Sequence, residues 1–216
     1  MIISWYGHSC FKIQASSGGS QLVIVTDPFA KEAGLTPPRL QADIVTVSHQ
    51  HFDHNNAEAI GGNPFVVNLP GEYEVKSVII KGVPSFHDKS EGAERGGNTI
   101  YHIKAEGISL CHLGDLGQEK LTAQQLEQIG DVDVLFVPIG GKYTLDGSEA
   151  AEIINQIEPK IVIPMHYKVA GLAIGLDDEK EFLKEIGEAE TVDKIVLKKK
   201  DLPEEGAPTK VYIMKV

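Results

Sequence analysis

Three histidines and a carboxylate fall within one short stretch of the chain, Ser48-His49-Gln50-His51-Phe52-Asp53-His54. The whole chain has only 8 histidines in 216 residues, so this stretch is a cluster and not chance scatter. Neutral imidazole is the commonest nitrogen ligand of metal ions, and a carboxylate adds a hard oxygen donor. In an extended segment His49 and His51 point to the same side and can bind one ion, whereas Asp53 and His54 suit a second ion. Nitrogen and oxygen donors together favour zinc, with manganese or iron as alternatives.

Further donors stand where apolar segments typical of β-strands come to an end. The cluster itself follows such a segment at residues 44–47, and four more residues share this position: Asp27, His87, Asp115 and His166. Open sheets place their ligand sites at strand ends, although a single histidine or aspartate there is ordinary surface or turn chemistry. The recurrence, together with the cluster, marks His87, Asp115 and His166 as candidate metal ligands.

The elements that must position these donors change in character along the chain. Residues 1–29 are expected to form an antiparallel β-meander with a turn at residues 16–20. From residue 120 onward, helices expected at 120–129, 149–158 and 178–185 alternate with short apolar strands. The polar, glycine-rich residues 88–98 are expected to form a mobile loop directly after His87. Because both halves need their sheets covered, we expect a layered α/β arrangement in one domain over residues 1–216.

Composition and charge restrict the possible partners. The formal net charge of −11 argues against a nucleic-acid or anionic membrane partner, although bound divalent ions would still admit an anionic small molecule. No apolar run approaches the roughly 20 residues of a membrane span, and no signal peptide is indicated. Cys10 and Cys111 are expected to be buried free thiols in a reducing cytoplasm. We therefore expect a cytoplasmic protein with a small-molecule substrate. The oligomeric state is open, and a homo-oligomer is one alternative.

The order of the donors resembles the metallo-β-lactamase-fold superfamily of metal-dependent hydrolases. The family pattern, an HxHxDH stretch followed by His, Asp and His at three strand ends, covers nearly the whole chain. The segments Gly7-His8-Ser9, residues 70–74 and residues 112–117 are similar to one branch of small bacterial and archaeal hydrolases without an assigned substrate. That branch is akin to the ascorbate-6-phosphate lactonases. The resemblance implies an αββα sandwich, with two β-sheets face to face and helices outside.

The resemblance also implies a centre with two divalent metal ions at one rim of the sandwich. One ion would take His49, His51 and His87, the other would take Asp53, His54 and His166, and Asp115 would bridge both. Asp27 would orient the ligand loop through hydrogen bonds, with a plain Asp-Pro turn as the alternative. In the family context, His51 in place of Glu favours hydrolysis over diiron electron transfer, and Asp115 in place of Cys disfavours β-lactam cleavage.

These residues predict a hydrolase in which a hydroxide shared by the two ions attacks an ester, lactone or phosphoester. Asp53 would assist proton movement, and His8 is either a substrate-contacting proton donor or a structural histidine. The alternatives are a metal-binding scaffold or sensor with little turnover and an iron-dependent oxidoreductase. The side chains weighed as packing or solvated residues against a site role are His102, His112, Tyr167, Arg95, Lys142 and Lys168. Residues 88–98 and 169–176 should carry specificity because both loops leave directly from ligands.

Overall fold

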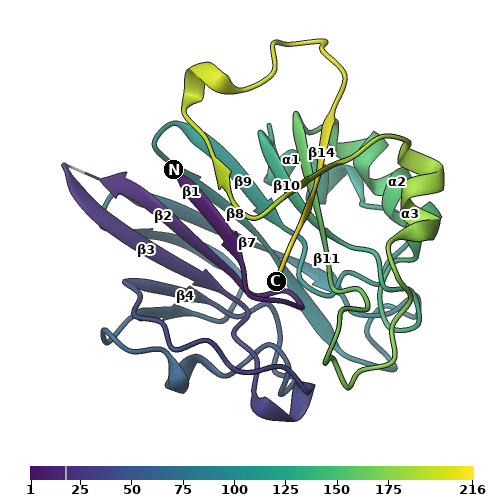
Figure 1. The fold of residues 1–216 in the computed structure, drawn as a ribbon, viewed down its shortest axis with the longest axis horizontal. Helices are drawn as coiled ribbons and strands as arrows, with labels where there is room; N and C mark the ends of the chain where they lie inside the picture. Colours follow the sequence, from purple (N-terminus) through teal and green to yellow (C-terminus); the bar gives the residue numbers. More distant parts are fainter. Residues whose placement is uncertain (18) are drawn as a thin grey trace.

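The computed structural model, which describes residues 1–17 and 19–216, consists of two β-sheets packed face to face (Figure 1). The smaller sheet has six strands in the order β13-β1-β2-β3-β4-β5. The larger sheet has eight strands in the order β12-β14-β11-β10-β9-β8-β7-β6. Both sheets contribute to one apolar core, which confirms the predicted α/β sandwich.

The six-stranded sheet is built from β1 (Ile2–Trp5), β2 (Phe11–Ser17), β3 (Ser20–Thr26), β4 (Ile44–Thr46), β5 (Phe65–Val67) and β13 (Ile195–Val196). Strands β1, β2 and β3 pair antiparallel, which confirms the predicted meander. The turn expected at residues 16–20 includes Gly18, which lies outside the described residues. Strands β4 and β5 then continue the sheet in parallel to β3.

The eight-stranded sheet is built from β6 (Gly71–Val75), β7 (Val78–Phe86), β8 (Gly97–Ala105), β9 (Ile108–His112), β10 (Val134–Pro138), β11 (Ile161–Met165), β12 (Glu190–Val192) and β14 (Lys210–Met214). Its strands β6 to β9 pair antiparallel, and β9, β10, β11 and β14 pair in parallel. The sequence did not predict β6 and β12, two edge strands whose residues are mostly exposed.

Strand direction brings the candidate donors to one rim. In the six-stranded sheet β1, β3 and β4 run in the same direction, because β2 opposes both β1 and β3. In the eight-stranded sheet β7, β9 and β11 likewise share one direction. Each candidate donor follows one of these six strands, so strand ends from both sheets meet at the site.

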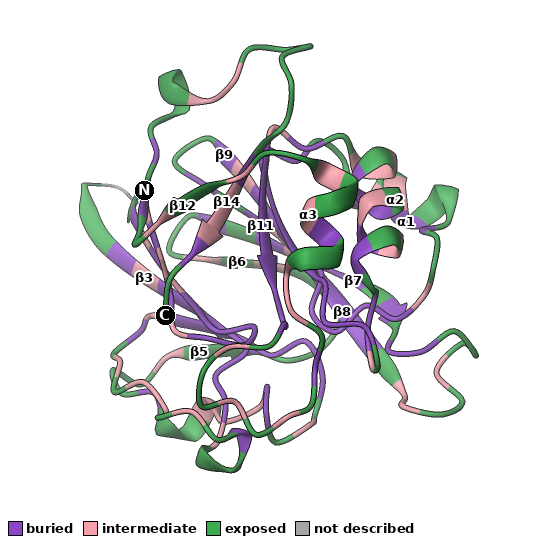
Figure 2. Cartoon of the chain, turned by 45° about the vertical axis from the view of Figure 1, so that its right-hand side comes forward, coloured by how far each residue is buried: buried purple, intermediate pink, exposed green. Residues whose placement is uncertain are grey.

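Three α-helices cover the outer face of the eight-stranded sheet: α1 (Ala123–Ile129), α2 (Gly147–Ile157) and α3 (Lys180–Ile186). Two of them begin with a capping box, Thr122 with Gln125 in α1 and Asp146 with Glu149 in α2, which satisfies backbone N–H groups of the first turn. Figure 2 shows their buried sides turned toward the sheet and their exposed sides outward. These helices match the three predicted ones, with ends shifted by up to three residues.

Loops and short 3-10 helices, and no α-helix among the described residues, cover the outer face of the six-stranded sheet. Alternate residues of β3 face opposite sides, so Ile24 joins the core between the sheets and Val25 joins a second, smaller cluster with Phe29. Loops with the short 3-10 helices η1 (Lys31–Ala33) and η2 (Ala57–Ala59) cover this cluster, and a third, η3 (Lys199–Asp201), lies near the chain's end. The fourth layer is therefore made of loops and single turns, where the resemblance had implied helices.

The core between the sheets fixes how they face each other. The ring of Phe11 on β2 lies 4.5 Å from that of Phe136 on β10, measured between centroids. The hydroxyl of Tyr101 on β8 donates to the backbone oxygens of Val47 and Val67, at 3.0 and 3.2 Å. Cys10 and Cys111 are buried free thiols, as predicted. In the part of the chain that the structure describes, no helix has the length and apolar character needed to cross a membrane.

Candidate metal centre

The ligand cluster folds into a tight loop directly after β4. The N–H of Val47 still donates to the carbonyl of Val67 at 2.9 Å, so the chain leaves the sheet only after this residue. The N–H groups of His54 and Asn55 then both donate to the carbonyl of His51, at 3.0 and 3.1 Å. This turn returns His54 toward His49, and the centroids of their rings lie 4.3 Å apart.

Asp115 lies at the centre of the candidate ligands. Its carboxylate faces the Nε2 atoms of four histidines, at 3.8 Å for His49, 3.2 Å for His54, 3.2 Å for His87 and 3.1 Å for His166. Two of these histidines follow β4, and the others follow β7 and β11. A carboxylate has two oxygens and can therefore contact two cations at once, which suits this central position.

Asn98 on β8 holds the backbone of Asp115 in place. Its side-chain oxygen accepts from the N–H of Asp115 at 3.0 Å, while its amide donates to the Ser85 hydroxyl and the Leu113 carbonyl, each at 2.8 Å. Gly114 adopts a φ of 57°, and a Cβ there would lie 2.3 Å from the Asn98 oxygen. Sequence reasoning missed Asn98, because only the pairing of β8 with β9 brings it beside Asp115.

The donors form two groups, which a third group of His49, His54 and Asp115 connects. One group contains His49, His51 and His87, and a second contains Asp53, His54, His166 and also His8, with potential ligand atoms within 4.8 Å of one another in each. This division matches the one that the resemblance implied, and it adds His8, whose Nε2 lies 3.1 Å from Oδ2 of Asp53. Of the seven predicted ligands, His51 is half-buried and the others are buried.

Ser48 and Asp27 orient two of the histidines. The Ser48 hydroxyl donates to Oδ2 of Asp27 at 2.6 Å and lies 3.0 Å from Nδ1 of His49. Oδ2 of Asp27 also lies 2.9 Å from Nδ1 of His54. Because the Nδ1 atoms are thereby occupied, Nε2 is the nitrogen that each ring leaves for a metal ion, and His54 must lose a proton before its Nε2 can bind one. The Asp27 carboxylate is therefore tied into the ligand loop, and a plain Asp-Pro turn does not describe it.

Burial and neighbouring charges set the protonation of the cluster. Burial lowers the pKa of His49 to about 2 and that of His8 to about 4, so both rings are neutral at pH 7. Burial alone would lower the pKa of His54 too, but the Asp115 and Asp27 carboxylates raise it well above its ordinary value. Burial would raise the pKa of Asp115, yet His166 and His54 hold it well below the usual range.

Several atoms of the cluster lack the partners that buried polar atoms normally have. Among the described residues, Nε2 of His49, Nε2 of His54 and Oδ1 of Asp115 are buried without a well-aligned hydrogen bond, although the last two atoms form an ion pair 3.2 Å apart. A buried polar atom without a partner costs roughly 1–3 kcal/mol, so three in one place need an explanation. Neutral imidazoles and ionised carboxylates are the donor forms that divalent ions bind, and the donor set therefore fits metal ions.

Comparison with known proteins agrees with this geometry. Residues 2–166 match the family described as the beta-lactamase superfamily domain. The chain belongs to the β-lactamase superfamily. Within it, the chain is 31% identical to a UPF0173 metal-dependent hydrolase of Thermococcus onnurineus, covering 91% of this chain and 96% of that protein. It is 32% identical to a counterpart from Thermoplasma acidophilum, over 79% of this chain and 84% of the relative.

A solved structure from Thermotoga maritima extends the likeness to three dimensions. That protein, a candidate Zn-dependent hydrolase of the metallo-β-lactamase superfamily, superposes with a TM-score of 0.79 at 40% identity. The match covers 99% of this chain and 97% of the other. Together these likenesses place this superfamily member in the UPF0173 metal-dependent hydrolase branch, as the sequence motifs predicted.

Four residues that the sequence offered as possible site residues lie outside the two donor groups. The Nε2 of His112 lies 3.0 Å from the Ser9 carbonyl, and its Nδ1 accepts from Gly114, so His112 joins backbone segments. Tyr167 is buried and stacks on Trp5, with ring centroids 5.2 Å apart. His102 lies within β8, away from the rim. Lys168 is exposed.

The segment after His87, for which the sequence predicts a mobile loop, is folded around one carboxylate. Four backbone N–H groups, those of Ser90, Gly92, Glu94 and Arg95, donate to the carboxylate of Asp88 at 2.7–3.1 Å. Burial would raise the pKa of Asp88, but these four bonds lower it below its usual value. Residues 88–96 therefore form a compact turn built around one carboxylate, and residues 97 and 98 already belong to β8.

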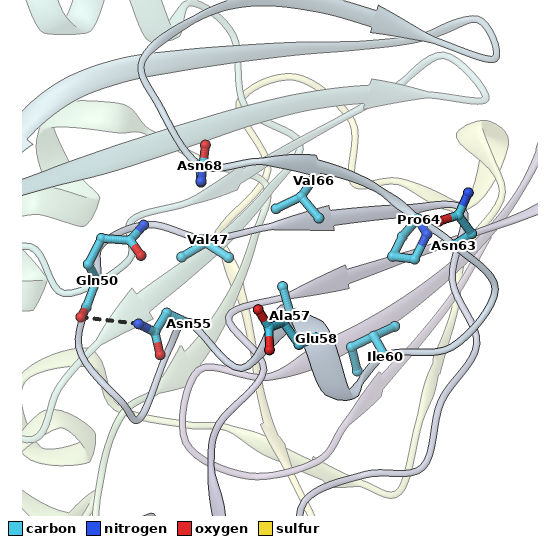
Figure 3. Close-up of a pocket in the computed structure, with 10 residues that line it drawn as sticks. All are labelled: Val47, Gln50, Asn55, Ala57, Glu58, Ile60, Asn63, Pro64, Val66 and Asn68. Atoms are coloured by element: carbon cyan, nitrogen blue, oxygen red, sulfur yellow. Dashed lines mark hydrogen bonds between the residues drawn. The ribbon is translucent and has the colours of Figure 1, made fainter.

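A hollow of about 510 Å³ lies beside the ligand loop (Figure 3). Gln50 and Asn55 of that loop line it, joined by a hydrogen bond of 3.2 Å, together with residues next to β5 such as Asn68. None of the candidate ligands lines this hollow. Its lining is therefore distinct from the two donor groups.

Proposed function

We propose that the protein is a hydrolase that uses two divalent metal ions, zinc by preference, to cleave an ester, lactone or phosphoester bond of a small molecule. One observation carries this proposal. The Asp115 carboxylate lies between two groups of imidazoles, within 3.8 Å of an Nε2 atom from each of His49, His54, His87 and His166. The names of the relatives, metal-dependent hydrolases, support the same reaction class.

The donor groups support one set of ligands for each of the two proposed ions. His49, His51 and His87 would hold one ion, Asp53, His54 and His166 would hold the other, and Asp115 would contact both. Bound there, divalent ions lower the pKa of water to supply a nucleophile at neutral pH and polarise the substrate oxygen. Imidazole-rich donors favour zinc over calcium or magnesium.

Asp53 and His8 form the proton-handling side of the site. Burial would raise the pKa of Asp53, but the hydrogen bond from His8 and the charge of His54 lower it, so the side chain is a carboxylate at neutral pH. Neutral His8 donates Nε2–H to Oδ2 of Asp53 at 3.1 Å, and its Nδ1 is buried without a partner among the described residues. In this proposal Asp53 would assist proton movement during turnover, and His8 would hold its carboxylate in position.

For the partner, the cellular location and the oligomeric state, the proposal follows the sequence. The net charge of −11, from 31 acidic and 20 basic residues, favours a small molecule over nucleic acid or a membrane as partner. Two free buried thiols are in keeping with a cytoplasmic location. Assembly into a homo-oligomer remains one alternative.

A metal-resolved activity screen tests the proposal. Protein loaded with zinc, manganese or iron is assayed against a lactone, a carboxylic ester and a phosphodiester, with Asp115→Asn as the blank. We expect metal-stimulated hydrolysis of at least one class, and a loss of about 100-fold or more in kcat for Asp115→Asn. Asp201→Asn, an exposed position on η3, is the matched control. A protein that binds no transition metal and gains no activity with any of them would contradict the proposal. Tight metal binding without turnover would support a scaffold or sensor.

A further inference from the structure

A second, smaller hollow lies beside the donor groups and is not used by the proposed chemistry. It has a volume of about 240 Å³ and reaches from His87 to the turn that follows β10. The compact turn of residues 88–96 forms one wall, and Lys142, Tyr143 and Thr144 form the other. Because His87 belongs both to the hollow and to a donor group, a molecule held here would lie next to the metal centre.

Two cationic side chains converge on one aromatic ring in this hollow. The guanidinium carbon of Arg95 lies 3.9 Å from the centroid of the Tyr143 ring, and Nζ of Lys142 lies 5.2 Å from the same centroid. The two cations come from different walls. Arg95 stands on the turn after β7, where its own N–H donates to Asp88 at 2.7 Å, and Lys142 stands on the turn after β10.

Backbone contacts order the two turns that carry Arg95 and Lys142. Asp88 orders the turn that carries Arg95, through the four N–H groups described above. Lys142 adopts a left-handed φ of 31°, which a non-glycine residue rarely takes without support from its surroundings. The neighbouring N–H of Thr144 donates to the carbonyl of Gly141 at 2.7 Å, which closes this turn. The turn thus places Lys142, which is exposed, and Tyr143, which is half-buried, at the edge of the hollow.

The acidic groups of the hollow are occupied elsewhere. Asp88 uses both carboxylate oxygens for backbone N–H groups, and Glu94 accepts from the Ser90 hydroxyl at 2.8 Å. The third cation, Lys89, pairs with Glu119 and Glu149. Over residues 1–17 and 19–216, no carboxylate lies within ion-pair distance of Arg95 or Lys142. A chain with 31 acidic and 20 basic residues thus presents two unpaired cations at one hollow beside its metal centre.

We propose that this hollow is a substrate subsite that binds an oxyanion, a carboxylate or a phosphate carried by the substrate, through Arg95 and Lys142. Arg95 supplies a planar fork of N–H donors, Lys142 supplies a point charge, and the Tyr143 ring keeps the guanidinium in place. The inference rests on the proposed function, which supplies the reacting bond next to His87. The substrate is therefore a small ester or lactone with an anionic group a few bonds from the bond that is cleaved.

Two aryl esters that differ in one charge test the subsite. 4-Nitrophenyl hemisuccinate carries a terminal carboxylate, and 4-nitrophenyl butyrate is its uncharged counterpart. We expect wild-type zinc-loaded protein to prefer the hemisuccinate in kcat/KM. Arg95→Gln and Lys142→Gln should each lower the ratio of the two kcat/KM values roughly tenfold, the loss of one charge-assisted hydrogen bond, mainly through KM. Lys168→Gln, an exposed lysine that does not line the hollow, is the control and should leave the ratio unchanged.

Calorimetric titration with succinate and with inorganic phosphate gives a second readout that needs no turnover. Anions that contact only the metal ions bind wild type and both variants alike, whereas binding in the subsite is weakened by each variant. Whichever of succinate and phosphate loses more affinity in the variants shows whether the subsite prefers a carboxylate or a phosphate. Weakened binding without ester hydrolysis by wild type would uphold the subsite and overturn hydrolysis of these esters. Hydrolysis with an unchanged ester ratio and unchanged anion binding in both variants would overturn the subsite alone.

Discussion

Nδ1 of His54 lies 2.9 Å from Oδ2 of Asp27, and both side chains are completely buried. This carboxylate–imidazole pair orients the ring and increases the donor strength of its other nitrogen, Nε2, which faces Asp115. Asp27 sits at the end of β3, a strand away from the ligand loop in the sheet, and it also accepts from the N–H and hydroxyl of Ser48. One carboxylate thus fixes both ends of the Ser48–His54 loop.

Asp27→Asn is expected to weaken metal binding by about 10- to 100-fold, the usual cost of losing a partner of a ligating histidine. The amide keeps the size of the side chain but loses the charge that supports His54. Zinc affinity is measured by competition with a chromophoric chelator. Asp43→Asn is the control, because Asp43 accepts from Val23 and pairs with Lys76 away from the site. Equal zinc affinity in Asp27→Asn and wild type would show that the pair has no role in ligation.

Metal uptake should release a proton from His54. Carboxylates on both sides raise the pKa of this ring well above its ordinary value, so the metal-free protein keeps His54 protonated at pH 7. An ion must displace that proton, and its affinity therefore rises with pH until the raised pKa is passed. Calorimetry in buffers of different ionisation enthalpy should show about one more proton released by wild type than by His54→Gln. Identical proton release in the two proteins would contradict this.

Metal removal is expected to destabilise the fold, because each donor group takes side chains from both sheets. His49 and His51 follow β4 in one sheet and His87 follows β7 in the other, so a bound ion joins the two. At free metal 100 times the dissociation constant, binding adds about 2.7 kcal/mol to the free energy of unfolding. Urea unfolding with and without a chelator measures the difference. The double variant His87→Ala/His166→Ala should respond far less, and an equal response would contradict the assignment.

Gly140→Ala tests the close contact that supports His166. A Cβ at Gly140 would lie 2.2 Å from the backbone oxygen of His166, so the loop after β11 must move. We expect a loss of about 1–3 kcal/mol in stability together with weaker metal binding. Gly97→Ala is the matched control, since its nearest neighbour would be 3.9 Å away. Thermal unfolding and zinc titration of both variants decide the point, and a Gly140→Ala protein equal to wild type in both would refute it.

His8→Ala should separate positioning from ligation. The variant removes the hydrogen bond to Asp53 and one of the four donors in that group. If His8 holds the Asp53 carboxylate, kcat falls by about 10- to 100-fold while two ions per chain remain bound. Metal content by elemental analysis is measured beside kcat and KM. Loss of one ion would make His8 a ligand instead, and unchanged kinetics would leave it a structural histidine.

The sequence predicted which candidate donors come together, because they follow strands that the apolar pattern reveals. His87, Asp115 and His166 each come after such a segment, and the shared direction of β7, β9 and β11 brings them together. The role of Asn98 was not predictable, because it acts across a strand pairing on a residue 17 positions away. The hydrogen bonding of residues 88–96 was not predictable, because a polar, glycine-rich composition does not reveal that four N–H groups donate to the Asp88 carboxylate. Edge strand β6 was missed because few of its side chains are buried.

The two cysteines offer kinetic reporters of how the sandwich opens. Cys10 is buried in the cluster beneath the loop layer, and Cys111 is buried between the sheets. Burial raises the pKa of both thiols, and the nearby Asp27 charge raises that of Cys10 further, so neither reacts while enclosed. Labelling of Cys10 therefore measures how often the loop layer detaches, and labelling of Cys111 measures separation of the sheets. The ratio of the two rates, with and without zinc, tells whether the ion restrains the ligand loop alone or the whole molecule.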